Sequence, residues 1–521
     1  MKASPDVDVL IVGSGPAGAT YARTIGDAVS AARILMVEVG PHLPGPRGEH
    51  THNLSPADRH AAQLLTQGPD TGIERAKAMA DLAEGADPSM EFRQIVLPGL
   101  FFVDPRPALA DGEVGLPAAS MASGVGGMGV HWAASCPRPQ QSERIPFIAA
   151  DELDAALGHA EALLGVTVLG SDQGVAGALR STMAEAFDGP GLSPVGFMPI
   201  AAKWDGSKLH FSGTAAILGD IEATAPGFEL RAETLARRIL VEDGVAAGAE
   251  LEDRRTGEVS VVRARHVVVC ADGLRTAQVL FASGVRPPEL GRYLNDHLQM
   301  VSLVRLDDAF VDDAFVASPG TADDASGMEG IGYVLVPFSD ARPIQGGVMS
   351  LANSPYKFVA GARVDERLGL VGWYGAKDLQ SADAVEFAET ETDHYGMPRM
   401  SIRYSYTTRD LETIENMRRL SRQSARLIGT LVEQPALAAG GASLHYQGTV
   451  RMGATDDGRS VCDPDLRVWG VRNLYVGGNG VIPTSTASNP TLTTVALAWR
   501  AATRIAAELG AIDSDVGALH R

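Results

Sequence analysis

The sequence has few cysteines and no excess of basic residues. Its 521 residues include three cysteines, Cys136, Cys270 and Cys462, which cannot staple a chain of this length and form no C-x-x-C pair for zinc. We therefore expect no metal site and a reducing, cytoplasmic setting. The 64 acidic residues outnumber the 44 Lys and Arg residues, which gives a formal net charge of −20. A protein of that sign repels phosphate groups, so we expect no nucleic-acid partner.

Apolar runs long enough to cross a membrane are also missing. Residues 1–8 lack the apolar core and the cleavage site of a signal peptide. The densest apolar helix, near the C-terminus, carries Arg500, Arg504 and Glu508, which a bilayer-spanning helix would not tolerate. The signatures G-x-S-x-G, H-E-x-x-H and G-x-x-x-x-G-K-S/T do not occur. We expect no membrane partner and none of these hydrolase or nucleotidase chemistries.

Residues 7–40 have the pattern of a strand, a glycine turn, a helix and a second strand. Val9–Val12 is a continuous apolar run of the kind found in buried parallel strands. The turn Gly13–Gly18 reads G-x-G-x-x-G, in which Gly15 lets the backbone approach a pyrophosphate at the helix N-terminus. Glu38 follows the second strand, 20 residues after the turn, where a carboxylate would bind an adenosine ribose hydroxyl. The unit predicts dinucleotide binding; a tight turn without a ligand is the alternative.

Similar strand-and-glycine pieces recur far along the chain, at 267–273 and 473–480. Residues 123–132 form a glycine-dense run that can pass close under a large planar ligand. Residues 301–400 alternate apolar and polar side chains, which favours a mainly antiparallel sheet. Within them, 312–330 is small, polar and acidic, which is typical of an exposed mobile loop. Apolar strands that lead into glycine turns occur at the beginning, in the middle and at the end of the chain. This distribution predicts one discontinuous domain, with a second domain inserted between its parts.

Three segments resemble those of the glucose-methanol-choline (GMC) oxidoreductases, in particular their pyranose oxidase and C-glycoside 3-oxidase branch. Residues 126–132 resemble the flavin-attachment segment, residues 444–453 the catalytic-histidine segment, and residues 489–493 the second catalytic segment. The order and spacing of these segments cover essentially the whole chain.

The resemblance implies an α/β fold: a discontinuous Rossmann-like FAD-binding domain with an inserted α+β substrate-binding domain built on a mainly antiparallel sheet. The FAD-binding domain is predicted to comprise residues 1–140, 225–300 and 440–521, and the substrate-binding domain residues 141–224 and 301–439, with the loop 312–330 as a candidate lid.

FAD is the cofactor that the resemblance implies. Its expected contacts are Gly13, Ser14, Gly15, Pro16, Ala17, Gly18, Glu38, Ser123, Gly126, Gly127, Gly129, Val130, His131, Leu235, Cys270, Ala271, Gly478, Asn479, Asn489, Pro490 and Thr491. In fungal members of the branch, the histidine that matches His131 bonds covalently to the flavin and follows a threonine. Because Val130 stands in that place here, we predict noncovalent FAD, with a covalent link at His131 as the alternative.

The resemblance makes His445 the catalytic base, with Asn489 and Gln345 as further substrate contacts. Imidazole, with a reference pKa of about 6.5, suits removal of a hydroxyl proton near neutral pH, although a lone histidine in an apolar stretch is also typical of a core. Asn489 directly precedes Pro490, the pattern of an N-cap before a helix expected to end at Gly510. An amide held there would orient the substrate oxygen. Gln345 resembles a sugar-contacting position; a turn before two glycines is the alternative.

These features together predict an FAD-dependent enzyme that oxidises a secondary hydroxyl, at C3 or C2, of a pyranose sugar or glycoside. Hydride would pass to flavin N5, and electrons then to oxygen, giving hydrogen peroxide, or to a quinone-like acceptor. Three alternatives stay open: an NAD-linked sugar dehydrogenase, which the first glycine turn and Glu38 alone would equally suggest, an FAD-dependent oxidase of a non-sugar alcohol, and a flavin-binding protein without turnover.

Overall fold

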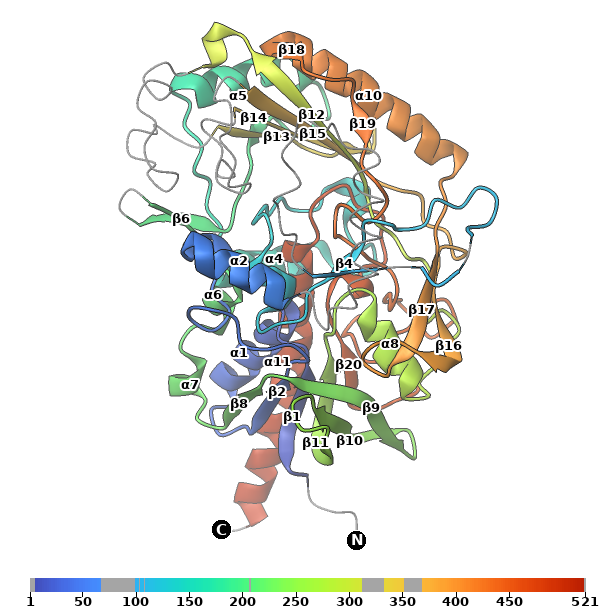
Figure 1. Cartoon of the computed structure of the whole chain (residues 1–521). Coiled ribbons are helices and arrows are strands. Elements are labelled where there is room, and N and C mark those ends of the chain that lie inside the picture. The colour runs from blue at the N-terminus through green and yellow to red at the C-terminus, as the bar shows by residue number, and fades with distance from the viewer. Residues whose placement is uncertain are drawn as a thin grey trace.

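Two large sheets form the two ends of the molecule in the computed structural model (Figure 1). The structure describes residues 5–66, 99–102, 104–106, 108–205, 208–311, 332–350 and 368–519. The predicted loop 312–330 lies outside the described residues. The mixed α/β class predicted from the sequence is confirmed.

The first sheet, at the lower end of Figure 1, collects strands from the beginning, middle and end of the chain. They are β1 (Val7–Val12), β2 (Ile34–Val37), β8 (Phe228–Arg231), β9 (Thr234–Glu242), β10 (Val245–Asp253), β11 (Val259–Val269) and β20 (Leu474–Val476). The order is β8-β2-β1-β11-β10-β9, and β20 pairs with the second half of β11. β8, β2, β1, β11 and β20 run parallel, whereas β9 and β10 are antiparallel. The apolar runs of β1 and β2 are buried, as expected for parallel strands.

Helices cover this sheet and pack on one another. They are α1 (Pro16–Ala28), α4 (Ala150–Leu164), α6 (Thr214–Leu218), α7 (Ile221–Thr224), α8 (Arg275–Ala282) and α11 (Thr491–Leu519). α2 (Pro56–Leu65) packs instead on the 3-10 turn at Thr51–Asn53. α1 packs against α11, and α11 against α4. α1 begins inside the first glycine turn, at Pro16, and its buried Ala17 belongs to the same hydrophobic core as Leu492 and Val495 of α11.

The last helix differs from the prediction at both ends. α11 begins at Thr491, and the Thr494 N–H donates to the Pro490 carbonyl (2.9 Å). Pro490 therefore takes the capping position, and Asn489 lies outside the helix rather than being its N-cap. The helix also continues past Gly510 to Leu519, because a single glycine inside a helix costs only about 1 kcal/mol.

The second sheet, at the upper end of Figure 1, is antiparallel throughout, which confirms the alternation seen in the sequence. Its strands are β5 (Gly196–Phe197), β12 (Leu298–Leu306), β13 (Tyr333–Val336), β14 (Ile344–Ser350), β15 (Leu368–Gly375), β18 (Gly429–Leu431) and β19 (Ala436–Leu437). α5 (Gly174–Phe187) and α10 (Thr408–Ile428) pack on this sheet and on each other. The Thr407 hydroxyl and the Asp410 carboxylate form a capping box at the start of α10.

Shorter elements complete the fold. They are the pairs β3 (Leu100–Phe101) with β4 (Ser120–Met121), β6 (Ala202–Asp205) with β7 (Lys208–Phe211), and β16 (Ala384–Thr392) with β17 (Pro398–Arg403), and the 3-10 turns η1 (Thr51–Asn53), η3 (Gly127–Val130), η4 (Gln141–Glu143), η5 (Asp308–Phe310) and η6 (Asn479–Val481). β12 begins at Leu298, directly after the first-sheet portion of the chain, so residues 295–297 lie at the seam between the two sheets.

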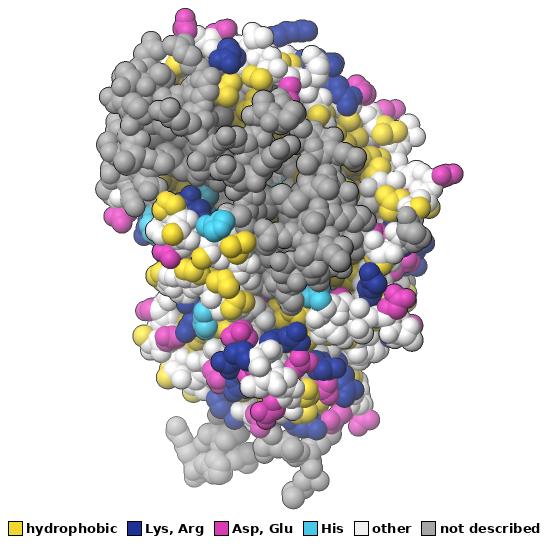
Figure 2. Space-filling view, viewed as in Figure 1, with side chains coloured by type: hydrophobic (Ala, Val, Ile, Leu, Met, Phe, Trp, Pro, Cys, Tyr) yellow, Lys and Arg dark blue, Asp and Glu magenta, His cyan; other side chains and the backbone are white. Residues whose placement is uncertain are grey.

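Acidic and basic side chains are interspersed at the lower end of the face in Figure 2. On the β9–β10 hairpin, Arg237 pairs with Glu252 (2.7 Å) and Arg238 with Glu250 (2.9 Å). Among the described residues, no helix is both long and apolar enough to cross a membrane. The same part of the chain holds no group of three metal-ligating side chains.

Candidate active site

The first glycine turn joins β1 to α1 and leaves no room for side chains at two positions. Gly13 has a φ of +101°, and a Cβ there would lie 2.3 Å from the Cys270 carbonyl oxygen. A Cβ on Gly18 would lie 2.1 Å from the Gly13 carbonyl oxygen. By contrast, a Cβ on Gly15 would meet nothing within 4 Å, so the backbone there faces open space at the start of a helix. That combination suits a bound pyrophosphate.

Glu38 lies at the end of β2, buried beside this turn. Its carboxylate accepts hydrogen bonds from the Ser14 hydroxyl (2.8 Å), the Ser14 N–H (3.2 Å) and the Gly40 N–H (3.1 Å). Burial raises the pKa of Glu38, while these donors and the charge of Arg275 lower it. The Ser14 hydroxyl also accepts from the Gly126 N–H (3.0 Å). Ser14 therefore links Glu38 to the second glycine run, and the carboxylate keeps acceptor capacity for a ligand hydroxyl.

The second glycine run packs against the first turn. A Cβ on Gly129 would lie 2.6 Å from the Pro16 ring, so the two segments touch. At the start of the run, the Ser123 hydroxyl accepts from the Arg275 guanidinium (3.0 Å) and from the Tyr395 hydroxyl (2.9 Å). The two glycine segments of the predicted cofactor site are therefore in contact.

His131 lies near the end of this run and has a ring nitrogen without a hydrogen-bond partner among the described residues. Its Nδ1 lies 3.5 Å from the Thr51 hydroxyl, and burial lowers the pKa of the ring to about 3. In the described part of the chain, its buried Nε2 has no hydrogen-bond partner. A buried polar atom without a partner is costly, so this position suits contact with a bound group.

The other predicted cofactor contacts lie at strand ends and helix starts. Ala17 lies in the first turn of α1, Gly127 and Val130 in η3, Leu235 in β9, Cys270 and Ala271 after β11, Gly478 and Asn479 at η6, and Pro490 and Thr491 at the start of α11. The Thr234 N–H donates to the Glu38 carbonyl (2.8 Å), which places the start of β9 beside β2. The Thr494 hydroxyl donates to Asn479 Oδ1 (2.6 Å), which joins η6 to α11. The glycine cradle, Glu38 and the free His131 nitrogen fit an extended dinucleotide cofactor.

Both the backbone and the side chain of His445 make hydrogen bonds to neighbouring residues. Its backbone N–H donates to Asp296 Oδ1 (3.1 Å), and its Nδ1 lies 2.8 Å from His297 Nε2. The Asp296 carboxylate also accepts from the Gly441 N–H (3.1 Å) and from the Ser443 hydroxyl. Burial lowers the pKa of His445 to about 4. The ring is therefore neutral at physiological pH, which a proton acceptor requires.

Asn489 contacts Gln345, so the structure brings these two predicted residues together. Gln345 lies within β14 and is 1% exposed, which corrects the interpretation of this position as a turn. Its Nε2 donates to Asn489 Oδ1 (3.4 Å), and its Oε1 accepts from the Ser488 hydroxyl (3.3 Å). Buried Glu143 anchors the same loop by accepting from the Ala487 and Ser488 N–H groups, each at 2.8 Å. Within the described residues, no hydrogen bond joins His445 directly to Asn489.

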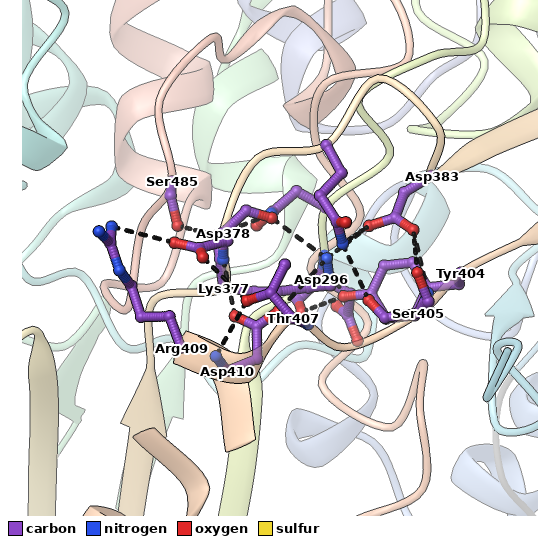
Figure 3. Close-up of polar contacts among 12 residues, drawn as sticks. Asp296, Lys377, Asp378, Asp383, Tyr404, Ser405, Thr407, Arg409, Asp410 and Ser485 are labelled. Carbon is purple, nitrogen blue, oxygen red and sulfur yellow. Dashed lines mark hydrogen bonds and ion pairs between the residues drawn. The ribbon is translucent and has the colours of Figure 1, made fainter. Parts of the chain in front are cut away.

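A buried lysine cluster, formed by Lys377, Asp383, Tyr404 and Asp410, supports the seam (Figure 3). Lys377 is 0% exposed; its ammonium pairs with Asp383, lies 3.9 Å from Asp410 and stands 4.7 Å from the Tyr404 ring centroid. The Tyr404 hydroxyl donates to the Asp296 carbonyl (2.6 Å). The cluster thus fixes the backbone of the residue whose carboxylate positions His445.

Sequence reasoning missed His297, Glu143 and Lys377. His297 and Glu143 act by contact with segments distant in sequence. Lys377 pairs with Asp383, six residues away, and with the more distant Asp410, and no local pattern marks any of the three residues. Nothing in the spacing of Asn295-Asp296-His297 indicates that His297 contacts His445.

Comparison with known proteins agrees with this geometry. Residues 140–299 and 383–498 match the N-terminal and C-terminal family models described as GMC oxidoreductase. The chain is 46% identical to a C-glycoside 3-oxidase of Microbacterium trichothecenolyticum, over 97% of each chain. It is 28% identical to a pyranose 2-oxidase of Tricholoma matsutake, over 96% of this chain and 94% of the other. A formate oxidase of Aspergillus oryzae, 14% identical, shares the fold with a TM-score of 0.65 over 97% of this chain and 99% of that one. Family models, relatives and fold agree, and the chain belongs to the GMC oxidoreductases, a family of FAD flavoproteins.

Proposed function

We propose that this protein oxidises a secondary hydroxyl of a pyranose sugar or glycoside to a ketone, with C3 favoured over C2. The observations that support the proposal are a half-buried His445 whose pKa is low enough to keep its ring neutral, and the contact between Gln345 and Asn489. The names of the relatives support the substrate class, and the 46% identical C-glycoside 3-oxidase favours attack at C3.

FAD, when bound, supplies the acceptor for the hydride that leaves the substrate carbon. Gly13–Gly18 would hold its pyrophosphate, Glu38 its ribose, and residues 123–131 its ring system. His445 accepts the hydroxyl proton, because its ring is neutral and Nδ1 is already engaged by His297. Asn489 Oδ1 accepts from Gln345, which leaves the Asn489 amide hydrogens to donate to the substrate oxygen.

We also propose the division into an FAD-binding domain (1–140, 225–300 and 440–521) and a substrate-binding domain (141–224 and 301–439). The first sheet takes its strands from the former ranges, which supports the proposal. α4 packs against α11, so residues 150–164 are the part of the substrate domain in closest contact with the other domain.

The cytoplasm is the compartment we propose. The three cysteines are buried and unpaired, and burial raises the pKa of each thiol. A chain that forms no disulfide from its cysteines suits a reducing compartment.

Anaerobic mixing with a panel of sugars and glycosides tests the activity. We expect bleaching of flavin absorbance by a pyranose or a glycoside, and a 3-keto product identified by NMR. A non-sugar alcohol and NAD with sugar serve as controls. If only the alcohol bleaches the flavin, the substrate class is wrong; if the product is a 2-keto sugar, the regiochemistry is wrong. Reoxidation by oxygen or by a quinone, compared in rate, identifies the acceptor.

Acid precipitation tests the attachment of the flavin. Because Val130 precedes His131, we expect a colourless pellet under a yellow supernatant. A yellow pellet would mean that the free Nε2 of His131 has bonded to the flavin. In that case His131→Ala should release all of the colour on precipitation, which identifies the residue.

A further inference from the structure

Glu143 is a buried carboxylate to which the proposed chemistry assigns no step. It is 2% exposed and is the last residue of η4. Its Oε1 accepts from the Ala487 and Ser488 N–H groups, and its Oε2 accepts from the Gln140 N–H, each at 2.8 Å. The Ser488 hydroxyl lies 2.8 Å from the same Oε2. Ala487 and Ser488 directly precede Asn489, so the carboxylate binds the backbone that carries this residue.

Hydrogen-bond donors surround Glu143 in place of a cation. In the described part of the chain, Glu143 forms no ion pair. A buried carboxylate needs donors or a cation to offset its lost hydration. An ionised carboxylate accepts at both oxygens and can satisfy all of these donors, whereas a neutral acid would present a donor of its own to them. Such charge-assisted hydrogen bonds are stronger than neutral ones, so the backbone before Asn489 is firmly held.

Glu143 is attached to the same loop at a second point and is itself held by its own turn. The Thr484 hydroxyl donates to the Glu143 carbonyl (2.8 Å). The Glu143 N–H donates to the Gln140 carbonyl (2.9 Å), so both the backbone and the side chain of Glu143 bind Gln140. Residues 484–488 are therefore bound to Glu143 at both ends.

The same loop also contacts the segment that carries His445. Gln447 lies two residues after His445, and its Nε2 donates to the Thr486 hydroxyl (2.9 Å). Gln447 and Thr486 are both buried. The Ser485 hydroxyl donates to the Lys377 carbonyl, which joins the loop to the buried lysine cluster (Figure 3). One loop thus contacts Glu143 and the His445 segment and leads directly into Asn489.

We propose that Glu143 is a positioning residue that holds the Asn489 amide in place relative to His445. Its carboxylate binds the two N–H groups that precede Asn489, in a loop that is tied to the His445 segment. Ser488 Oγ also lies 3.3 Å from Gln345 Oε1, so the held backbone contacts the residue whose amide meets Asn489. The inference rests on the proposed function for the role of Asn489. The hold on the loop does not depend on that role.

Hydrogen exchange of the holoenzyme measures the hold on the loop without any turnover. Glu143→Leu removes both acceptor oxygens, whereas Glu143→Gln keeps one oxygen for the Ala487 and Ser488 N–H groups. We expect Glu143→Leu to speed exchange in a peptide spanning residues 484–489 about 10–100-fold, as for lost hydrogen bonds to a charged group. Glu143→Gln should exchange more slowly than Glu143→Leu. Exchange in Glu143→Leu that equals wild type overturns the proposal.

Anaerobic flavin reduction by sugar measures the consequence for the reaction. We expect Glu143→Leu to keep FAD and to slow reduction about 10²-fold, the loss that a misplacement of about 1 Å can cause. Glu143→Gln should recover most of this rate, because its amide oxygen can still bind the loop. Equal rates for Glu143→Leu and wild type contradict the proposal.

A double-mutant cycle with Asn489→Ala distinguishes positioning from a purely structural role. If Glu143 acts through Asn489, Glu143→Leu should slow reduction no further once the Asn489 amide has been removed. A further loss of about 10²-fold in the Asn489→Ala background would mean that the two residues act independently, and the proposal would then be wrong.

The matched control is Glu161→Leu, which removes a carboxylate bound by Arg138 (2.7 Å) on α4, outside the contacts of the loop. Its exchange in residues 484–489 and its reduction rate should equal those of wild type. If Glu143→Leu does not fold, Glu143→Asp, which withdraws the carboxylate by one methylene, replaces it in every measurement. If no sugar reduces the wild-type flavin, the proposed function fails, and the exchange measurement alone decides whether Glu143 holds the loop.

Discussion

Replacing His445 with alanine should leave FAD bound and slow anaerobic flavin reduction by sugar about 10²–10⁴-fold, the usual loss for a removed general base. The hydroxyl proton then has no acceptor at the place where hydride leaves. FAD should remain because the described contacts of the His445 side chain are to His297 and not to the glycine cradle. Stopped-flow absorbance, with FAD content measured on the same sample, gives the result. A near-wild-type rate would return His445 to a structural role.

The pH profile of the wild-type enzyme provides a second test of the same residue. Burial lowers the pKa of His445 to about 4, so the neutral form persists well below pH 6. Protonation removes the acceptor, and the reduction rate should therefore fall only as the pH approaches 4. A half-maximal rate near pH 6.5 would show that the base has the ordinary pKa of an exposed histidine. The residual activity of His445→Ala should not show this fall in rate near pH 4.

Replacing Lys377 with methionine should cause a large loss of stability. The substitution keeps the length of the side chain but leaves Asp383 and Asp410 without their buried cation. Removing one partner of a buried ion pair costs about 3–5 kcal/mol, because the other charge stays out of water. The measurement is the thermal unfolding midpoint of the holoenzyme, followed by protein fluorescence and by release of FAD.

Two controls separate the buried charge from the loss of any ion pair. Arg231→Met removes the exposed pair with Glu229, for which about 0–1 kcal/mol is expected after solvent screening. Lys377→Met combined with Asp383→Asn removes one orphaned charge and should recover part of the loss. If Lys377→Met unfolds at the same temperature as Arg231→Met, the cluster does not stabilise the seam. If the double variant is no better than the single one, the loss comes from packing.

Local pattern was enough to predict the parallel strands β1, β2, β11 and β20 of the first sheet and the glycine turns that follow them, but not its antiparallel strands β9 and β10. A buried parallel strand such as Val9–Val12 is apolar at every position, and the turn that follows has a fixed glycine spacing. Alternation of side chains likewise predicted the antiparallel second sheet. These features depend on neighbours within a few residues, so they can be predicted from a single sequence.

Contacts between distant segments could not be predicted in this way. Asn489 fitted an N-cap, yet the helix begins two residues later and the amide contacts Gln345, which is 144 residues away. Gln345 before two glycines suggested a turn, but tertiary pairing with β13 and β15 makes it part of a strand. His297 and Lys377 acquire their roles only when the two sheets meet.

The seam at residues 295–297 limits how this enzyme can be re-engineered. The hydrogen bonds that orient His445 come from Asp296 and His297. The backbone of residues 295–297 is in turn held by the lysine cluster, which follows the second-sheet strand β15. A chimaera with the second sheet of a relative would replace the lysine cluster but keep residues 295–297. The contacts between these two parts would then be mismatched. Specificity is therefore better altered by point changes on β14 than by exchange of whole modules, and any recombination should carry residues 295–297, 377–410 and 441–445 as one block.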